Sequence, residues 1–156
     1  MGGISLELNT RLFGTIEYKE EDVVTFPSGI PSFEDEHEFL LLPIAGGEDA
    51  LLCMQSVTTP HLSFILMNPF SLDRSYAPVL RENEREVLQV ERDQDLCFHV
   101  LCAMKRPLSD STINLKCPIA VNPDKRIALQ VILDTDDYHM RHPLSQFVPD
   151  KEAAPC

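Results

Sequence analysis

Possible metal ligands crowd into one run of this 156-residue chain, DTDDYHMRH, between residues 134 and 142. The run offers carboxylate and imidazole side chains from Asp134, Asp136, Asp137, His139 and His142. A calcium loop that starts at the first of these aspartates requires glycine at its sixth position and glutamate at its twelfth. The sequence has histidine and serine there, so the run is more typical of a solvated turn that follows a strand.

Two cysteine–histidine pairs could in principle support nucleophilic catalysis. Cys97 and His99 lie two residues apart, which places them on one face of a strand, and Cys53 could meet His61 across neighbouring strands. No helix start or basic neighbour is placed to lower the pKa of either thiol, as a nucleophile would require. A small cytosolic enzyme with such a pair or with a metal site is therefore the alternative hypothesis. The primary hypothesis is a binding protein that is not an enzyme and uses no cofactor.

The cysteines also indicate a cellular compartment. They stand at positions 53, 97, 102, 117 and 156, mostly within apolar runs, and form no C-x-x-C pair. An odd number of cysteines without a secretory leader is typical of a reducing compartment, so we expect buried free thiols in a cytoplasmic protein. The longest apolar run, FLLLPIAGG, is far shorter than the ~20 residues that span a bilayer. We therefore expect no membrane segment.

Charge is the strongest signal in the sequence. The chain has a formal net charge of -12, which repels phosphate backbones and anionic lipid surfaces and favours a partner with a basic surface. Between residues 17 and 38, Lys19 is the only lysine or arginine, whereas the acidic residues there are Glu17, Glu20, Glu21, Asp22, Glu34, Asp35, Glu36 and Glu38. Such a run is often merely a solvated face.

Apolar residues within the same stretch favour a contact surface over a merely solvated one. Phe26, Ile30, Pro31 and Phe33 interrupt the acidic residues, and an apolar patch with a charged rim is typical of a protein-binding surface. A second apolar candidate is the turn in MNPF, at residues 67–70. The predicted contact residues are Glu17, Glu20, Glu21, Asp22, Phe33, Glu34, Asp35, Glu36, Asn68 and Pro69.

Short runs rich in β-branched and aromatic residues, separated by proline and glycine, predict an all-β protein. The predicted strands cover residues 7–12, 14–17, 22–26, 37–43, 51–57, 63–67, 96–104, 112–115, 119–121 and 127–133. Their short connections favour antiparallel pairing. The run NEREVLQV predicts one short helix with Asn83 as its N-cap. We expect a single compact β-barrel-like or sandwich domain over residues 1–147, followed by a flexible tail over residues 148–156.

Four blocks of the sequence, in order along the chain, resemble the FliW family of flagellar assembly factors. They are TRLFGTIEYKEEDVVTFPSGIPSFEDEHEFLLLP, MQSVTTPHLSFILMNPF, TINLKCPIAVNPDKRIALQVIL and YHMRHPL. The resemblance implies a cytoplasmic β-barrel-like protein without enzymatic activity that binds flagellin before its export. It also implies that the protein, once released from flagellin, binds the RNA-binding translational regulator CsrA and antagonises it, so that flagellin synthesis resumes.

Two positions depart from the pattern of that family. Ser32 stands where the family commonly has glycine, so a turn with positive φ must be formed by serine or avoided. Cys117 stands where a small residue such as alanine is usual, and a buried thiol can replace alanine with little change in volume. The shape of the loop around Ser32 is therefore the open question.

Overall fold

Short strands are the main secondary structure of the computed structural model, which describes residues 5–44 and 51–147. The strands are β1 (Ser5–Thr10), β2 (Gly14–Lys19), β3 (Val24–Thr25), β4 (Glu38–Pro43), β5 (Leu51–Ser56), β6 (Ser63–Met67), β7 (Cys97–Ala103), β8 (Thr112–Ile113), β9 (Ile119–Asn122), β10 (Ile127–Gln130) and β11 (His142–Pro143). The helices are α1 (Pro69–Leu72) and α2 (Glu82–Leu88), with 3-10 turns η1 (Glu20–Asp22), η2 (Asp93–Asp95), η3 (Leu108–Asp110) and η4 (Leu144–Gln146).

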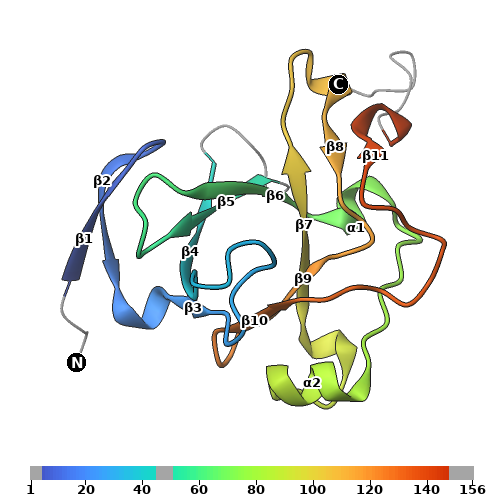
Figure 1. Cartoon of the computed structure of the whole chain (residues 1–156), viewed down its shortest axis with the longest axis horizontal. Helices are drawn as coiled ribbons and strands as arrows, with labels where there is room; N and C mark the ends of the chain where they lie inside the picture. The colour runs from blue at the N-terminus through green and yellow to red at the C-terminus, as the bar shows by residue number, and fades with distance from the viewer. Residues whose placement is uncertain (1–4, 45–50, 148–156) are drawn as a thin grey trace.

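The sheet closes on itself because β7 pairs with β9 as well as with β6 and β8 (Figure 1). The resulting ring runs through β7, β6, β5, β4, β3, β10 and β9. Its neighbouring strands are antiparallel except β3 and β10, which pair in parallel through Thr25 and Ile127. Strands β8 and β11 extend the sheet beyond β7, and β1 with β2 forms a separate hairpin. The all-β, barrel-like prediction is thus confirmed.

Alternation along β7 builds two hydrophobic cores. Phe98, Val100 and Cys102 face an outer core, between the barrel wall and the segments that carry Tyr76, α2 and η4. Leu101, on the opposite face of the same strand, packs against the core inside the barrel with Phe39, Met54 and Leu66. Because successive side chains of a strand point to opposite faces, one strand can separate two apolar regions, and both faces of β7 read as hydrophobic.

Several local predictions need correction. The predicted helix exists as α2, but Arg81 is its N-cap and Asn83 lies inside it. The single helical turn α1 and the two-residue strand β11 were not predicted from the sequence. Cys97 is exposed rather than buried, while Cys53, Cys102 and Cys117 are buried free thiols. The predicted tail over residues 148–156, including the last cysteine, lies outside the described residues, so the domain boundary at residue 147 stays a prediction.

Candidate functional site

The segment between β3 and β4, residues 26–37, forms a tight loop that we call the aromatic loop. Phe26 anchors its start, since it is 1% exposed and its ring meets the ring of Phe39 edge-on at 5.4 Å. Gly29 has φ +71, and a Cβ at this position would lie 2.3 Å from the carbonyl oxygen of Glu34. Ser32 also adopts a positive φ of 73. Serine therefore reaches the left-handed conformation that glycine would adopt more easily.

This loop geometry presents Phe33 at the surface. An isolated bridge joins Ile30 to Phe33, and the buried Ile30 fixes one side of it in the barrel core. The ring of Phe33 packs edge-on against Phe64 of β6 at 5.5 Å, yet 40% of the residue stays exposed. Phe33 is thus both a loop anchor and an exposed apolar surface.

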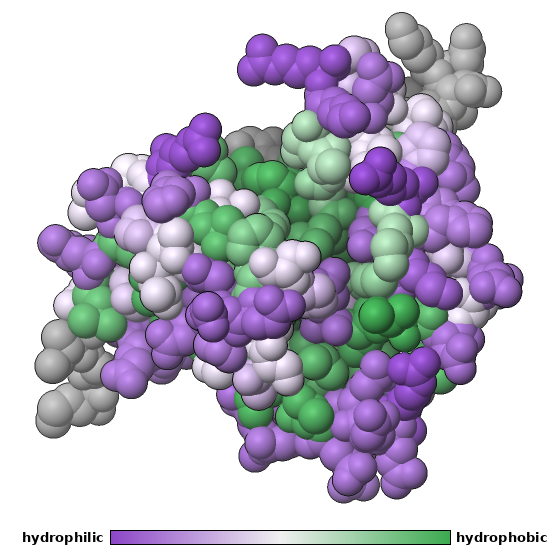
Figure 2. All heavy atoms as spheres, viewed as in Figure 1, coloured by the Kyte–Doolittle hydropathy of each residue, from purple (hydrophilic) through white to green (hydrophobic). Residues whose placement is uncertain are grey.

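An apolar cavity of about 340 Å³ lies beneath the aromatic loop. Its walls come from segments far apart in the sequence, and its lining includes Ile30, Phe33, Phe64, Leu101, Ile132 and Met140. Figure 2 shows hydrophobic residues gathered in the hollowed middle of this face, between the aromatic loop and the segment after β10. Exposed fractions of 53% for Ile132 and 56% for Met140 mean that this apolar surface is accessible to a partner.

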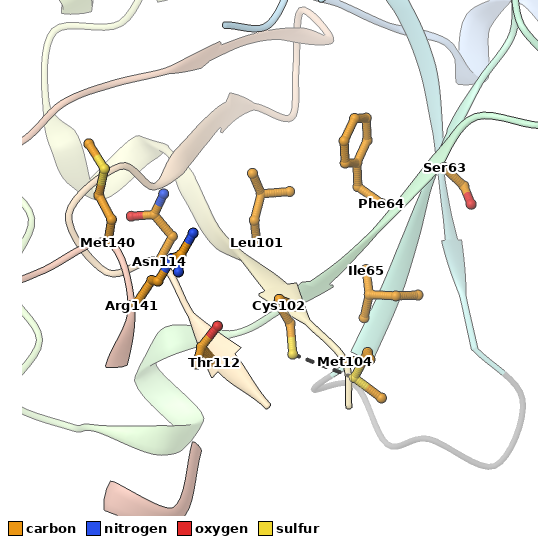
Figure 3. Close-up of a pocket in the computed structure, with 11 residues that line it drawn as sticks. Ser63, Phe64, Ile65, Leu101, Cys102, Met104, Thr112, Asn114, Met140 and Arg141 are labelled. Atoms are coloured by element: carbon orange, nitrogen blue, oxygen red, sulfur yellow. Dashed lines mark hydrogen bonds between the residues drawn. The ribbon is translucent and has the colours of Figure 1, made fainter. Parts of the chain in front are cut away.

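A second cavity, of about 420 Å³, continues from the first. The two share the lining residues Phe64, Leu101, Asn114 and Met140, so they form one continuous depression that we call the apolar groove. Figure 3 shows Phe64 and Leu101 on the barrel wall and Asn114, Met140 and Arg141 on the facing side. Apolar walls with a few polar groups are the usual composition of a binding site.

The acidic residues of β2 and η1 lie on the surface as the sequence predicts. Glu17, Glu20, Glu21 and Asp22 are all exposed, and we call them the acidic face. The carboxylate of Asp22 accepts a hydrogen bond from the main-chain N–H of Lys19 at 3.0 Å, which completes the η1 turn. This face can attract a basic partner by long-range electrostatics.

The second acidic cluster, in the aromatic loop, is divided between structural and exposed positions. Glu34 accepts a hydrogen bond from the main-chain N–H of Ser32 at 3.1 Å, and Asp35 is exposed. Glu36 is half-buried, and its carboxylate accepts hydrogen bonds of 2.5 Å from the hydroxyls of both Ser56 and Thr59. Glu36 therefore holds the aromatic loop to the β5–β6 hairpin. Its position in an acidic run of the sequence gave no indication of this structural role.

The predicted contacts at Asn68 and Pro69 have structural roles. The side chain of Asn68 accepts a hydrogen bond from the N–H of Phe70 at 2.9 Å, which caps α1, and Pro69 is buried as the first residue of that helix. A buried proline offers no surface to a partner, so we remove Pro69 from the proposed contacts. The exposed residue of this turn is Phe70 at 39%, which packs against Tyr76 at 5.7 Å.

Within the described ranges, the three buried cysteines show no arrangement that would activate a thiol. Burial raises the pKa of the Cys53, Cys102 and Cys117 thiols, whereas an activated nucleophile needs a lowered pKa. Burial also lowers the pKa of His99, which keeps its imidazole neutral.

Hydrogen bonds hold His142 in place within the histidine–aspartate run at residues 134–142. The Nε2 atom of His142 accepts a hydrogen bond of 2.8 Å from the main-chain N–H of His139, and its Nδ1 atom lies 3.2 Å from Oε1 of Gln146. Within residues 5–44 and 51–147, no three histidine, cysteine or acidic side chains are grouped as metal ligands. None of the helices in the same ranges is long and apolar enough to cross a membrane.

Apart from those of the aromatic loop, such as Ile30 and Phe33, most residues that line the groove were not singled out in the sequence. Phe64 reads equally well as core, and Leu101, Asn114, Ile132 and Met140 carry no motif in the sequence. The one available signal was the apolar character of β6 on both faces, since a strand with two apolar faces must be covered on both sides. This signal did not indicate that one face of β6 is left partly uncovered where it lines the groove.

Known proteins resemble the chain over most of its length. Residues 7–144 match the family model described as FliW protein. A Geobacillus relative (strain WCH70), named "Flagellar assembly factor FliW", is 38% identical over 148 residues, which cover 95% of this chain and 99% of the relative. A relative of the same name from Bacillus subtilis (strain 168) is 36% identical over 138 residues, covering 88% and 95%.

A solved structure confirms the fold. It carries the description "Crystal structure of the flagellar assembly factor FliW" and superposes with a TM-score of 0.84 at 38% identity, over 94% of this chain and 99% of that one. These relatives are named assembly factors rather than enzymes, which fits the primary hypothesis of a binding protein.

Proposed function

The chain belongs to the FliW family of flagellar assembly factors, and on this premise we propose that it binds flagellin and, when free of flagellin, binds and antagonises the translational regulator CsrA. The protein then acts in the cytoplasm as a chaperone-like partner of flagellin. Export of flagellin releases it, and the released protein relieves the repression of flagellin synthesis. One small domain therefore serves two partners.

The apolar groove supports the flagellin half of this proposal. Exposed apolar surface on a monomeric domain is typical of interaction sites, and here it is hollowed and lined by Phe33, Phe64 and Met140. A subunit that is held unpolymerised before export must keep apolar assembly surfaces covered. The groove is the one observation that carries this assignment, because it offers a concave apolar surface at which Phe33, Ile132 and Met140 stay exposed.

The acidic face supports the CsrA half. A protein that holds RNA phosphates carries positive charge, and the exposed carboxylates of Glu17, Glu20, Glu21 and Asp22 are complementary to it. Complementary charge mainly raises the association rate and selects the partner. The two partners thus use surfaces of different chemistry.

Charge reversal tests the acidic face. We expect the triple variant Glu20→Lys, Glu21→Lys, Asp22→Lys to weaken CsrA binding about tenfold or more at low ionic strength, and less at high salt because exposed charges are screened. Isothermal titration with purified CsrA measures this effect. A matched control, Asp134→Lys, Asp136→Lys, Asp137→Lys, changes the net charge equally at an exposed site elsewhere. Equal affinities of the two variants at low salt would remove the acidic face from the proposal.

Competition with RNA tests the form of antagonism. Labelled RNA bound to CsrA is titrated with this protein, and excess unlabelled RNA is then added. Direct competition for the RNA site predicts that enough RNA restores full RNA binding. A plateau below full binding would show instead that the protein distorts the RNA site from a neighbouring surface.

A further inference from the structure

Positive charge is gathered at one end of the apolar groove, in a chain with a net charge of -12. Arg141 lines the groove together with Met104, and Lys105 and Arg106 follow Met104 directly; all three basic residues are exposed. Asp110 is the acidic residue in the same β7–β8 connection. Three basic residues and one acidic residue give this end of the groove a local positive charge, in contrast to the net negative charge of the whole chain.

Strand pairing fixes this arrangement. The antiparallel pairing of β8 with β11 places His142 opposite Ile113, so the neighbouring Arg141 and Asn114 come together on the wall of the groove, as Figure 3 shows. The ion pairs among the described residues involve Arg81, Arg85 and Arg92 rather than Arg141. The guanidinium of Arg141 is therefore available to pair with a carboxylate of a partner.

Asn114 adds a fixed hydrogen-bonding group within the apolar lining. Its Oδ1 atom accepts a hydrogen bond of 2.9 Å from the main-chain N–H of Cys117, which orients the side chain. The side chain of Asn114 also faces the thiol of Cys117 and lines both cavities of the groove. An oriented polar group among mostly apolar walls is the usual device that sets the position of a bound chain.

The opposite end of the groove has the opposite charge. There the aromatic loop carries the exposed Glu34 and Asp35 immediately after Phe33. The groove is thus apolar in its middle, acidic at the Phe33 end and basic at the Arg141 end. A chain segment of matching polarity binds in one direction, because the reverse direction places like charges together.

From this polarity we infer that the groove binds a short segment of flagellin in which apolar side chains are followed, on one side, by carboxylates. The apolar side chains lie against Phe64, Leu101 and Met140, and the carboxylates lie next to Arg141. The inference rests on the proposed binding of flagellin and specifies the chemistry and the direction of the bound segment.

The experiment uses short overlapping synthetic peptides that cover purified flagellin, together with intact flagellin as a separate arm. We expect the peptides that bind this protein to contain an apolar block next to acidic residues. Arg141→Glu lowers the affinity for these peptides about tenfold at low ionic strength, and the difference shrinks at high salt. The matched control Lys125→Glu changes the charge equally at an exposed site away from the groove and leaves the affinity unchanged.

The arms separate two kinds of failure. If intact flagellin does not bind the wild-type protein, the proposed function is wrong. If intact flagellin binds but the bound peptides are basic, or none binds, or Arg141→Glu and Lys125→Glu behave alike, the inferred chemistry of the groove is wrong. Met140→Glu gives an independent check within the apolar middle, since it is exposed and should fold normally while weakening peptide binding.

Discussion

Removing the hydrogen bonds of Glu36 tests whether this residue is a structural tether or part of an acidic contact surface. Its two carboxylate oxygens accept hydrogen bonds from the hydroxyls of Ser56 and Thr59, each 2.5 Å long. A hydrogen bond to a charged group contributes about 1.5–3 kcal/mol, and partial solvation favours the lower end of this range. The pair therefore contributes about 3 kcal/mol to the free energy of unfolding.

Glu36→Gln keeps the shape of the side chain and one carbonyl oxygen. We expect it to lose about half of that contribution, or about 1.5 kcal/mol. For a chain of this length, 1 kcal/mol corresponds to about 2–4 °C in Tm, so the expected loss is about 3–6 °C. Urea unfolding at neutral pH measures the free energy, and calorimetry measures the Tm.

Asp35→Asn is the matched control, since it removes the same charge from the neighbouring exposed position. We expect it to change the free energy of unfolding by less than about 0.5 kcal/mol. A double-mutant cycle of Glu36→Gln with Thr59→Val should give a coupling energy of about 1 kcal/mol. Equal stabilities of the two single variants, or a coupling near zero, would refute the tether.

Three further outcomes follow from the same structure. Gly29→Ala should lower the free energy of unfolding by about 2 kcal/mol or more, because its Cβ would lie 2.3 Å from the carbonyl oxygen of Glu34; Gly14→Ala, with φ +67 and open space, should cost about 1 kcal/mol in the same urea titration. Tyr76→Phe should cost about 1–2 kcal/mol by calorimetry, because it removes a hydrogen bond of 2.8 Å to a buried main-chain carbonyl. Burial lowers the pKa of His99 from 6.5, so the unfolded chain binds a proton at higher pH than the folded one, and the stability present above pH 6.5 is lost as pH falls. His99→Gln should therefore lose less stability than the wild type between pH 7 and pH 5, as Tm measurements across this range would show.

The strands could be predicted from the sequence because the pattern that specifies a strand is local. In SFILM, apolar side chains alternate across two faces that both read as hydrophobic, and this predicts a central strand, as β6 is between β5 and β7. The helix N-cap was misplaced by two residues because α2 begins after Arg81, whose main-chain N–H donates a hydrogen bond of 2.7 Å to the carboxylate of Glu84, and this interaction outweighs the intrinsic preference of Asn83.

Part of the candidate site was also accessible from the sequence. The acidic face was predicted correctly as exposed, because a run of charged residues has no stable alternative to water. Phe33 was predicted as either a loop anchor or an exposed contact; it packs against Phe64 and is 40% exposed, and its contact with a partner stays a prediction. The sequence could not indicate that Glu36 is held by two hydroxyls, because Ser56 and Thr59 are distant in the chain and meet it only in the fold.

The sequence by itself therefore determined most of the strands, the helix α2, the acidic surface and the family. Only the tertiary structure decided that β7 and β9 close the barrel, that Pro69 is buried, and that an apolar groove stays open beside Leu101. The physical reason is that alternation and turn residues act over a few positions, whereas a groove exists where distant segments fail to cover a surface. Whether an apolar side chain becomes core or contact depends on what the rest of the chain places over it.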